Sequence, residues 1–139
     1  MTIQILLVED DHEEATLFQE MLDLFGQHDR WQLHHVINGL EAIKFLKKET
    51  PYQNAPKVDI VFSDYNMPRM SGEEMLLDLH SGDWWKGYPV IVILTNYDFG
   101  AEKIKNLYQL GAASFIPKPK ELSVFQKIFT YWVDCVELP

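Results

Sequence analysis

The sequence predicts an α/β fold in which a five-stranded parallel sheet is covered by helices on both faces. Three observations lead to this prediction. Five short strand-like runs alternate with five segments of helical period, and Ile3–Val8 is a continuous apolar run apart from Gln4, as in a strand that is buried on both faces. The chain of 139 residues, with 47% hydrophobic and 24% charged residues, can bury one core. Because strands joined by helical crossovers run parallel, residues 1–139 are expected to form a single α/β domain without repeats.

Each predicted strand is a short run rich in apolar and β-branched residues. In chain order the runs are IQILLV (3–8), WQLHHVI (31–37), KVDIVFS (57–63), PVIVILTN (89–96) and AASFI (112–116). The third run leads directly into the carboxylate of Asp64, and a proline follows within four residues. A lone aspartate after a strand is usually a turn former, so a functional role for Asp64 requires partners elsewhere in the chain.

Between these runs, apolar residues recur every three or four positions, which is typical of helices with one buried face. In chain order the apolar positions are Ala15, Phe18, Met21, Leu22 and Phe25; Leu40, Ile43 and Leu46; Met75, Leu76 and Leu79; Ile104, Leu107 and Leu110; and Leu122, Phe125, Ile128, Phe129, Trp132, Val133 and Val136. Asp11 with Glu14, and Ser71 with Glu74, have the spacing of a capping box, and Gly26 is a fitting stop for the first helix.

The charge and the apolar runs argue against several classes of function. A net charge of -9 disfavours direct binding to nucleic acid or to an anionic membrane surface. The longest apolar run, 89–94, is far too short to cross a membrane, and the N-terminal MTIQILLVEDD lacks the basic start of a signal peptide. A cytoplasmic protein is therefore expected, in which the single Cys135 excludes an internal disulfide.

Polar residues follow four of the five predicted strands, where the carboxyl ends of parallel strands meet and ligands bind. Glu9 and Asp10 follow the first strand, Asp64 the third, Thr95 ends the fourth, and Lys118 follows the fifth. Crowded carboxylates repel one another, and a divalent cation with oxygen ligands, Mg²⁺, relieves the repulsion. One carboxylate then becomes a candidate nucleophile for phosphoryl transfer. The alternative is that the acids after the first strand only favour a helix start.

Four segments carry a resemblance to a known family. ILLVEDD, VFSDYNMPRMSG, VIVILTN and FIPKPKEL resemble, in order and over nearly the whole chain, the signature segments of two-component response-regulator receiver domains. The resemblance implies a flavodoxin-like (βα)5 three-layer sandwich with sheet order 2-1-3-4-5. It also implies phosphorylation by a sensor histidine kinase or a phosphotransfer protein. The implied roles are the phosphorylated residue for Asp64, metal binding for Glu9, Asp10, Asp64 and Asn66, phosphoryl binding for Thr95 and Lys118, and switching for Thr95 and Phe115.

The chain also departs from the family pattern. Asn96 stands where the family has a small residue, so access to the acceptor is expected to be tighter. Asn66 and Tyr97 occupy the two variable positions that tune hydrolysis of the phosphoryl group, and Tyr97 is expected to shield it. Phe115 has no hydroxyl, so its signal is expected to depend on ring burial alone. In the family the peptide bond before Pro119 is cis.

The predicted last helix ends close to Pro139, so no effector domain is expected and the output should pass to a downstream protein. The other expected partner is a second copy of this chain, with which it would form a homodimer. The resemblance places the switching face on the fourth helix, fifth strand and fifth helix. The long 47–57 loop and the chain end resemble a subgroup of stand-alone receivers, some of which partner phytochrome-type kinases.

Two other functions remain open from the sequence. An aspartate-nucleophile phosphatase would use Asp64 to attack phosphorylated substrates other than itself. Such enzymes require a second acid two residues later, where this chain has Asn66. A docking module that is never phosphorylated would not need the costly acidic cluster. No enzymatic activity beyond self-phosphorylation and slow self-dephosphorylation is expected.

Overall fold

The computed structural model describes residues 2–24, 26, 29–81, 89–96, 100–119 and 121–137. Its five strands form one parallel sheet of order β2-β1-β3-β4-β5, which confirms the predicted α/β fold and the sheet order implied by the resemblance. The strands are β1 (Ile3–Val8), β2 (Trp31–Val36), β3 (Ile60–Asp64), β4 (Val90–Thr95) and β5 (Ser114–Pro117).

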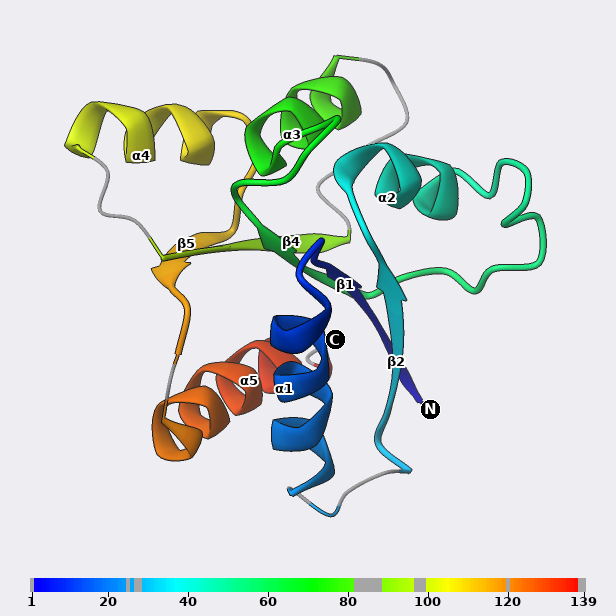
Figure 1. Ribbon diagram of the computed structural model, residues 1–139, viewed down its shortest axis with the longest axis vertical. Helices are drawn as coiled ribbons and strands as arrows, with labels where there is room; N and C mark the ends of the chain where they lie inside the picture. Colours follow the sequence, from blue (N-terminus) through cyan, green and yellow to red (C-terminus); the bar gives the residue numbers. More distant parts are fainter. Residues whose placement is uncertain are drawn as a thin grey trace.

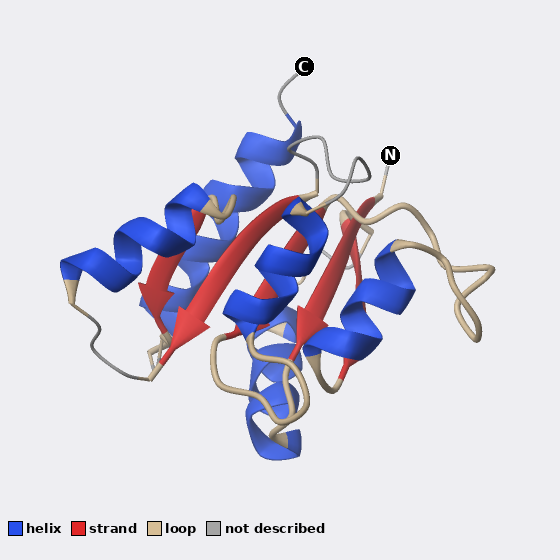
Figure 2. Cartoon of the chain, turned by 90° about the horizontal axis from the view of Figure 1, so that it is seen from above, coloured by secondary structure: helices blue, strands red, loops and turns tan. Residues whose placement is uncertain are grey.

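Helices cover both faces of this sheet, giving three layers (Figures 1 and 2). The helices are α1 (His12–Asp23), α2 (Gly39–Leu46), α3 (Gly72–His80), α4 (Ala101–Gln109) and α5 (Leu122–Glu137). Figure 1 shows α2, α3 and α4 on one face and α1 and α5 on the other. The view from above in Figure 2 shows α2, α3 and α4 lying across the strands.

The core has two parts because alternate side chains of a strand point to opposite faces of the sheet. On β1, Leu6 and Val8 pack beneath α2 and α3, whereas Ile5 and Leu7 pack against α1 and α5. All four of these side chains are buried. Burial on both faces explains why β1 is apolar at five of its six positions, and why the first three residues of β3 are apolar.

Helix boundaries and faces differ from the prediction in detail. The predicted stripe of α2 included Leu40, but this side chain is 37% exposed, and the buried face contains Ala42, Ile43, Phe45 and Leu46. The helix begins at Gly39 after the Asn38 cap, and Leu40 is therefore in a first turn that faces solvent. Likewise, Leu122 in the first turn of α5 is exposed, whereas Phe125, Phe129 and Val133 are buried. Phe25 and the 82–88 connection lie outside the described residues.

The two predicted capping boxes have different outcomes. Ser71 and Glu74 form both hydrogen bonds of the box at the start of α3. At α1, Asp11 caps the backbone N–H groups of Glu13 and Glu14, but the Glu14 side chain does not return to the cap. No helix within the described ranges is long and apolar enough to cross a membrane.

Candidate functional site

The packing of α3 against the end of β3 places Asp64 at the carboxyl edge of the sheet. The N–H of Tyr65 donates to the carbonyl of Leu94 at 2.9 Å, and the N–H of Gly72 donates to the carbonyl of Tyr65 at 2.9 Å. A Cβ atom on Gly72 would lie 2.9 Å from the Asp64 carbonyl oxygen, so this close approach requires glycine. Asp64 is consequently buried, with 8% of its surface exposed.

Glu9 and Asp10 meet Asp64 at this edge, as predicted. One carboxylate oxygen of each of the three residues lies within 4.8 Å of the others. The backbone of Glu9 is fixed by a hydrogen bond from its N–H to the Val36 carbonyl at 3.0 Å and by a contact of 2.8 Å between its carbonyl and Nε2 of His35. Glu9 is buried, whereas Asp10 is exposed.

This acidic cluster suits a magnesium ion. Its ligand atoms are all carboxylate oxygens, and the exposed side of Asp10 leaves room for the waters that Mg²⁺ retains. Burial raises the pKa of Glu9 to about 8, with Lys118 opposing this shift and the charge of Asp64 adding to it. Burial also raises the pKa of Asp64, again with Lys118 opposing. Burial is the main cause of both raised pKa values, and the charges of neighbouring carboxylates add to it; a dication would stabilise the charged form of both groups.

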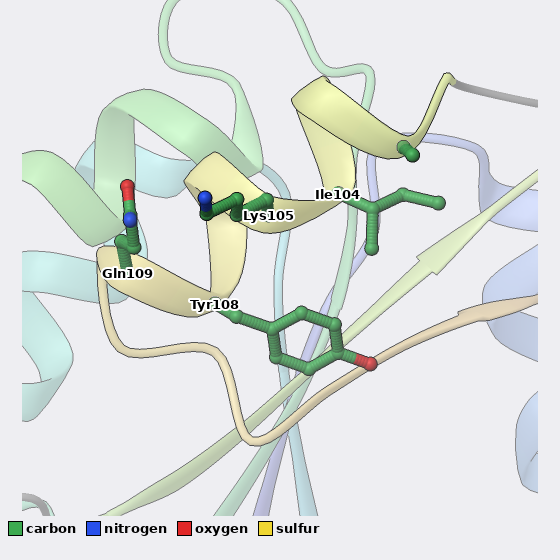
Figure 3. Close-up of a pocket in the computed structure, with 5 residues that line it drawn as sticks. Ile104, Lys105, Tyr108 and Gln109 are labelled. Atoms are coloured by element: carbon green, nitrogen blue, oxygen red, sulfur yellow. The ribbon is translucent and has the colours of Figure 1, made fainter.

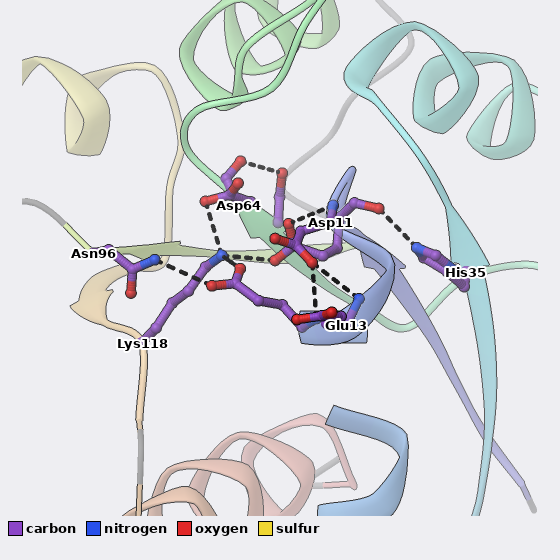
Figure 4. A network of polar contacts seen from close by, with 9 residues as sticks. Asp11, Glu13, His35, Asp64, Asn96 and Lys118 are labelled. Carbon is purple, nitrogen blue, oxygen red and sulfur yellow. Dashed lines mark hydrogen bonds and ion pairs between the residues drawn. The ribbon is translucent and has the colours of Figure 1, made fainter. Parts of the chain in front are cut away.

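Lys118 brings its ammonium group to the same cluster (Figure 4). Its backbone N–H donates to the Thr95 carbonyl at 2.7 Å, and its Nζ lies 2.7 Å from Oε1 of Glu9 and 3.3 Å from Oδ1 of Asp64. Nζ also contacts Oε2 of Glu14. Burial works to lower the pKa of Lys118, but its hydrogen bonds to Glu14 and Glu9 outweigh this effect and hold the pKa above its ordinary value.

The other predicted site residues have mixed outcomes. Thr95 is buried at the end of β4, and Phe115 is partly buried on β5. Asn66 is exposed two residues after Asp64. Tyr97 lies outside the described residues, so its shielding role stays a prediction.

The expectation of a cis peptide bond before Pro119 is wrong for this structure. Among the described residues, the cis peptide bond joins Thr50 to Pro51. Lys118 nevertheless reaches the acidic cluster, because its backbone hydrogen bond to Thr95 fixes the chain as it leaves β5.

Sequence reasoning missed two sets of contacts. Glu14 was expected only as a capping residue, yet its carboxylate binds Lys118, 104 residues away, and accepts a hydrogen bond from Nδ2 of Asn96 at 3.3 Å. The rule that gathers residues at the ends of the strands does not reach Glu14, which lies within the first turn of α1.

The second set joins three elements. The Tyr65 hydroxyl donates to Oε2 of Glu73 on α3 at 2.7 Å, and Nζ of Lys103 on α4 lies 2.6 Å from the same oxygen. The Lys103 ammonium also lies over the Tyr65 ring, 5.5 Å from its centroid. The Tyr65 ring in turn meets the Phe115 ring edge-on, with centroids 6.3 Å apart.

An acidic cluster and a lysine at the carboxyl edge of a 2-1-3-4-5 sheet are the features that the sequence resemblance to receiver domains predicts. The chain belongs to the response regulator receiver domain family, and the family match covers residues 5–130.

The similar proteins agree with this assignment. The chain is 29% identical to the response regulator Rcp1 of Synechocystis sp., over 97% of this chain and 92% of that protein. It is 28% identical to the two-component response regulator ARR17 of Arabidopsis thaliana, over 96% and 86% of the two chains. Two crystal structures resemble it along nearly their whole length. The phosphorylated cyanobacterial phytochrome response regulator RcpA has a TM-score of 0.85 at 28% identity, and it covers 100% of this chain and 99% of its own. The Mn²⁺-bound form of Rcp1 has a TM-score of 0.83 at 27% identity, with 99% of each chain covered.

Proposed function

We propose that this chain accepts a phosphoryl group on Asp64 from a sensor histidine kinase or a phosphotransfer protein. The observation that carries the proposal is the Lys118 ammonium, which lies 3.3 Å from Oδ1 of Asp64 and beside the cluster of Glu9, Asp10 and Asp64. A lysine and a metal-binding cluster around one carboxylate are the groups that phosphoryl transfer requires, since it depends on positioning and charge stabilisation.

In the proposed reaction, a carboxylate oxygen of Asp64 attacks the phosphorus of the donor. The new O–P bond forms as the P–N bond of the donor phosphohistidine breaks, and the electron pair of that bond stays on the imidazole nitrogen. Lys118 binds a phosphoryl oxygen, and the Thr95 hydroxyl binds another. Glu9, Asp10, Asp64 and the backbone carbonyl of Asn66 would hold Mg²⁺, which supplies positive charge against the phosphoryl oxygens.

The phosphoryl donor is proposed to be a phytochrome-type kinase. The support is the likeness to RcpA, a cyanobacterial phytochrome response regulator, along the whole of this chain. The likeness to Rcp1 includes a crystal structure with bound Mn²⁺, which supports a divalent cation at the acidic cluster. The metal proposed for this chain is Mg²⁺, which takes the same kind of oxygen ligands.

The output is proposed to pass through a face formed by α4, β5 and α5. Its support is the chain of contacts from Tyr65, next to the acceptor, to Phe115 on β5 and Lys103 on α4. On α4 the side chains of Ile104 and Tyr108 border an open hollow of about 530 Å³ (Figure 3). A downstream protein is the proposed partner for this face, and a second copy of the chain is the other.

Incubation with acetyl phosphate and Mg²⁺ tests the acceptor role. Each wild-type chain is expected to gain one phosphoryl group by intact-protein mass spectrometry, and the gain should be lost in Asp64→Asn and when EDTA removes the metal. In this reaction the P–O bond of the donor breaks and acetate leaves with the electron pair. Continuous release of inorganic phosphate at a rate far above the decay of the labelled protein would support a phosphatase instead. No labelling at all would support the docking module.

A further inference from the structure

We propose that Glu14 is a positioning residue that competes with the phosphoryl group for the Lys118 ammonium and thereby slows phosphorylation of Asp64. This inference rests on the proposed acceptor function of Asp64. It assigns a regulatory role to a side chain on the first turn of α1, outside both the acidic cluster and the phosphoryl-binding pair.

The partners of Lys118 carry the inference. An ammonium group has three N–H donors. In this structure Nζ contacts three carboxylates, which belong to Glu9, Asp64 and Glu14. Glu9 and Asp64 also belong to the acidic cluster. In the loaded site Glu9 would hold the metal ion and Asp64 would carry the phosphoryl group. Glu14 is therefore the one of these three carboxylates that would still compete with the phosphoryl group for the Lys118 ammonium.

The local structure directs Glu14 toward Lys118. In a complete capping box the Glu14 carboxylate would accept the N–H of Asp11, but that N–H donates to Oε2 of Glu9 at 3.2 Å. The Glu14 carboxylate therefore makes no capping hydrogen bond and points toward the site instead. There Nδ2 of Asn96 donates to its Oε1 at 3.3 Å. The other oxygen, Oε2, contacts Lys118.

The position of Glu14 has two consequences for the reaction. Its charge stabilises Lys118 on the α1 side of the site, and this stabilisation is lost when Lys118 turns to a phosphoryl oxygen. The Glu14 carboxylate also places a further acidic group beside the site that an anionic donor must approach. Both consequences act against transfer.

Glu14→Gln and the matched control Glu13→Gln separate this effect from the simple loss of one negative charge. Glu13 is the preceding residue of the same helical turn, it is exposed, and none of the described contacts of Lys118 involves it. At saturating Mg²⁺, Glu14→Gln is expected to accelerate labelling by acetyl phosphate about three- to tenfold, the factor for a half-exposed, hydrogen-bonded ion pair. Glu13→Gln should change the rate by less than about twofold.

Beryllofluoride, a mimic of the phosphoryl group, gives a readout that does not depend on turnover. By isothermal titration calorimetry at saturating Mg²⁺, Glu14→Gln should tighten its binding by a similar factor of about three to ten. The same substitution made in a Lys118→Ala background should change the affinity by less than about twofold, because the competition needs the ammonium.

Failure of the Glu14 inference and failure of the acceptor function would give different results. Equal rates for Glu14→Gln and Glu13→Gln, or a Glu14 effect that persists without Lys118, would overturn the inference and leave the acceptor function intact. A wild-type chain that acetyl phosphate does not label would overturn the acceptor function, and the inference with it.

Discussion

Replacing Gly72 by alanine is expected to disturb both the stability and the acceptor site, because the new methyl group points at the backbone of Asp64. The added Cβ would lie 2.9 Å from the Asp64 carbonyl oxygen and 3.3 Å from Cα of Tyr65. Both atoms belong to the backbone, so relief requires α3 and the end of β3 to move apart. Overpacking of this kind costs about 1–3 kcal/mol, whereas the lower entropy of the unfolded alanine chain returns about 0.5 kcal/mol. The net loss in the free energy of unfolding is therefore about 0.5–2.5 kcal/mol.

A shift of a few tenths of an ångström at Asp64 should also reduce phosphorylation, because a displacement of about 1 Å at a reacting group can cost about a hundredfold in rate. We expect labelling by acetyl phosphate to fall roughly tenfold in Gly72→Ala. Urea unfolding followed by far-ultraviolet circular dichroism measures the stability, and mass spectrometry measures the labelling.

Gly100→Ala is the matched control. Among the described residues, a Cβ on Gly100 meets nothing within 4 Å, and this N-cap residue of α4 has a φ of -66° that alanine also adopts. Its effect on stability should stay within about 0.5 kcal/mol, and its labelling rate should match the wild type. If Gly72→Ala behaved like Gly100→Ala in both assays, the close approach of α3 to Asp64 would not position the acceptor.

Three further predictions concern single side chains near the site. Tyr65→Phe should lower the free energy of unfolding by about 1 kcal/mol in urea titrations, since it removes the hydroxyl that donates to Glu73; an unchanged midpoint would contradict this. The Lys103 hydrogen bond holds the pKa of Glu73 below its ordinary value of 4.5, so the stability that Glu73 adds is present above pH 4.5 and lost as the pH falls through the lowered pKa. The difference in the free energy of unfolding between the wild type and Glu73→Gln should therefore shrink on acidification. A difference that stayed constant with pH would refute the stabilising role of the Glu73 charge. Asp10→Asn should weaken Mg²⁺ binding by about tenfold or more in calorimetry, while equal affinity would remove Asp10 from the metal site.

The sequence was sufficient for the strands and for the residues gathered at their carboxyl ends. A strand buried on both faces is mostly apolar, and in a parallel sheet the residues that follow the strands share one edge. These two rules brought Glu9, Asp10, Asp64 and Lys118 together without any long-range information. The structure confirms their proximity.

The sequence was not sufficient for side chains whose partners lie on other elements. Asp11 and Glu14 have the spacing of a capping box, but other contacts prevent its completion. The N–H of Asp11 donates to the Glu9 carboxylate, and the Glu14 carboxylate contacts Lys118. Ser71 and Glu74 have the same spacing, and the structure shows both hydrogen bonds of their box. In these two cases the local spacing predicts the cap itself, but the complete box forms only at α3, where Glu74 returns to the N–H of Ser71.

Tyr65 connects the proposed acceptor directly to the proposed output face. The covalent chain leads from Asp64 to Tyr65, whose ring touches Phe115 on β5 and lies beneath the Lys103 ammonium of α4. Its hydroxyl reaches Glu73, which also pairs with Lys103. If phosphorylation displaced the end of β3, contacts with β5, α3 and α4 would change through this one side chain. The coupling needs no relay across the sheet, because Tyr65 follows the acceptor in sequence and touches both β5 and α4 in space.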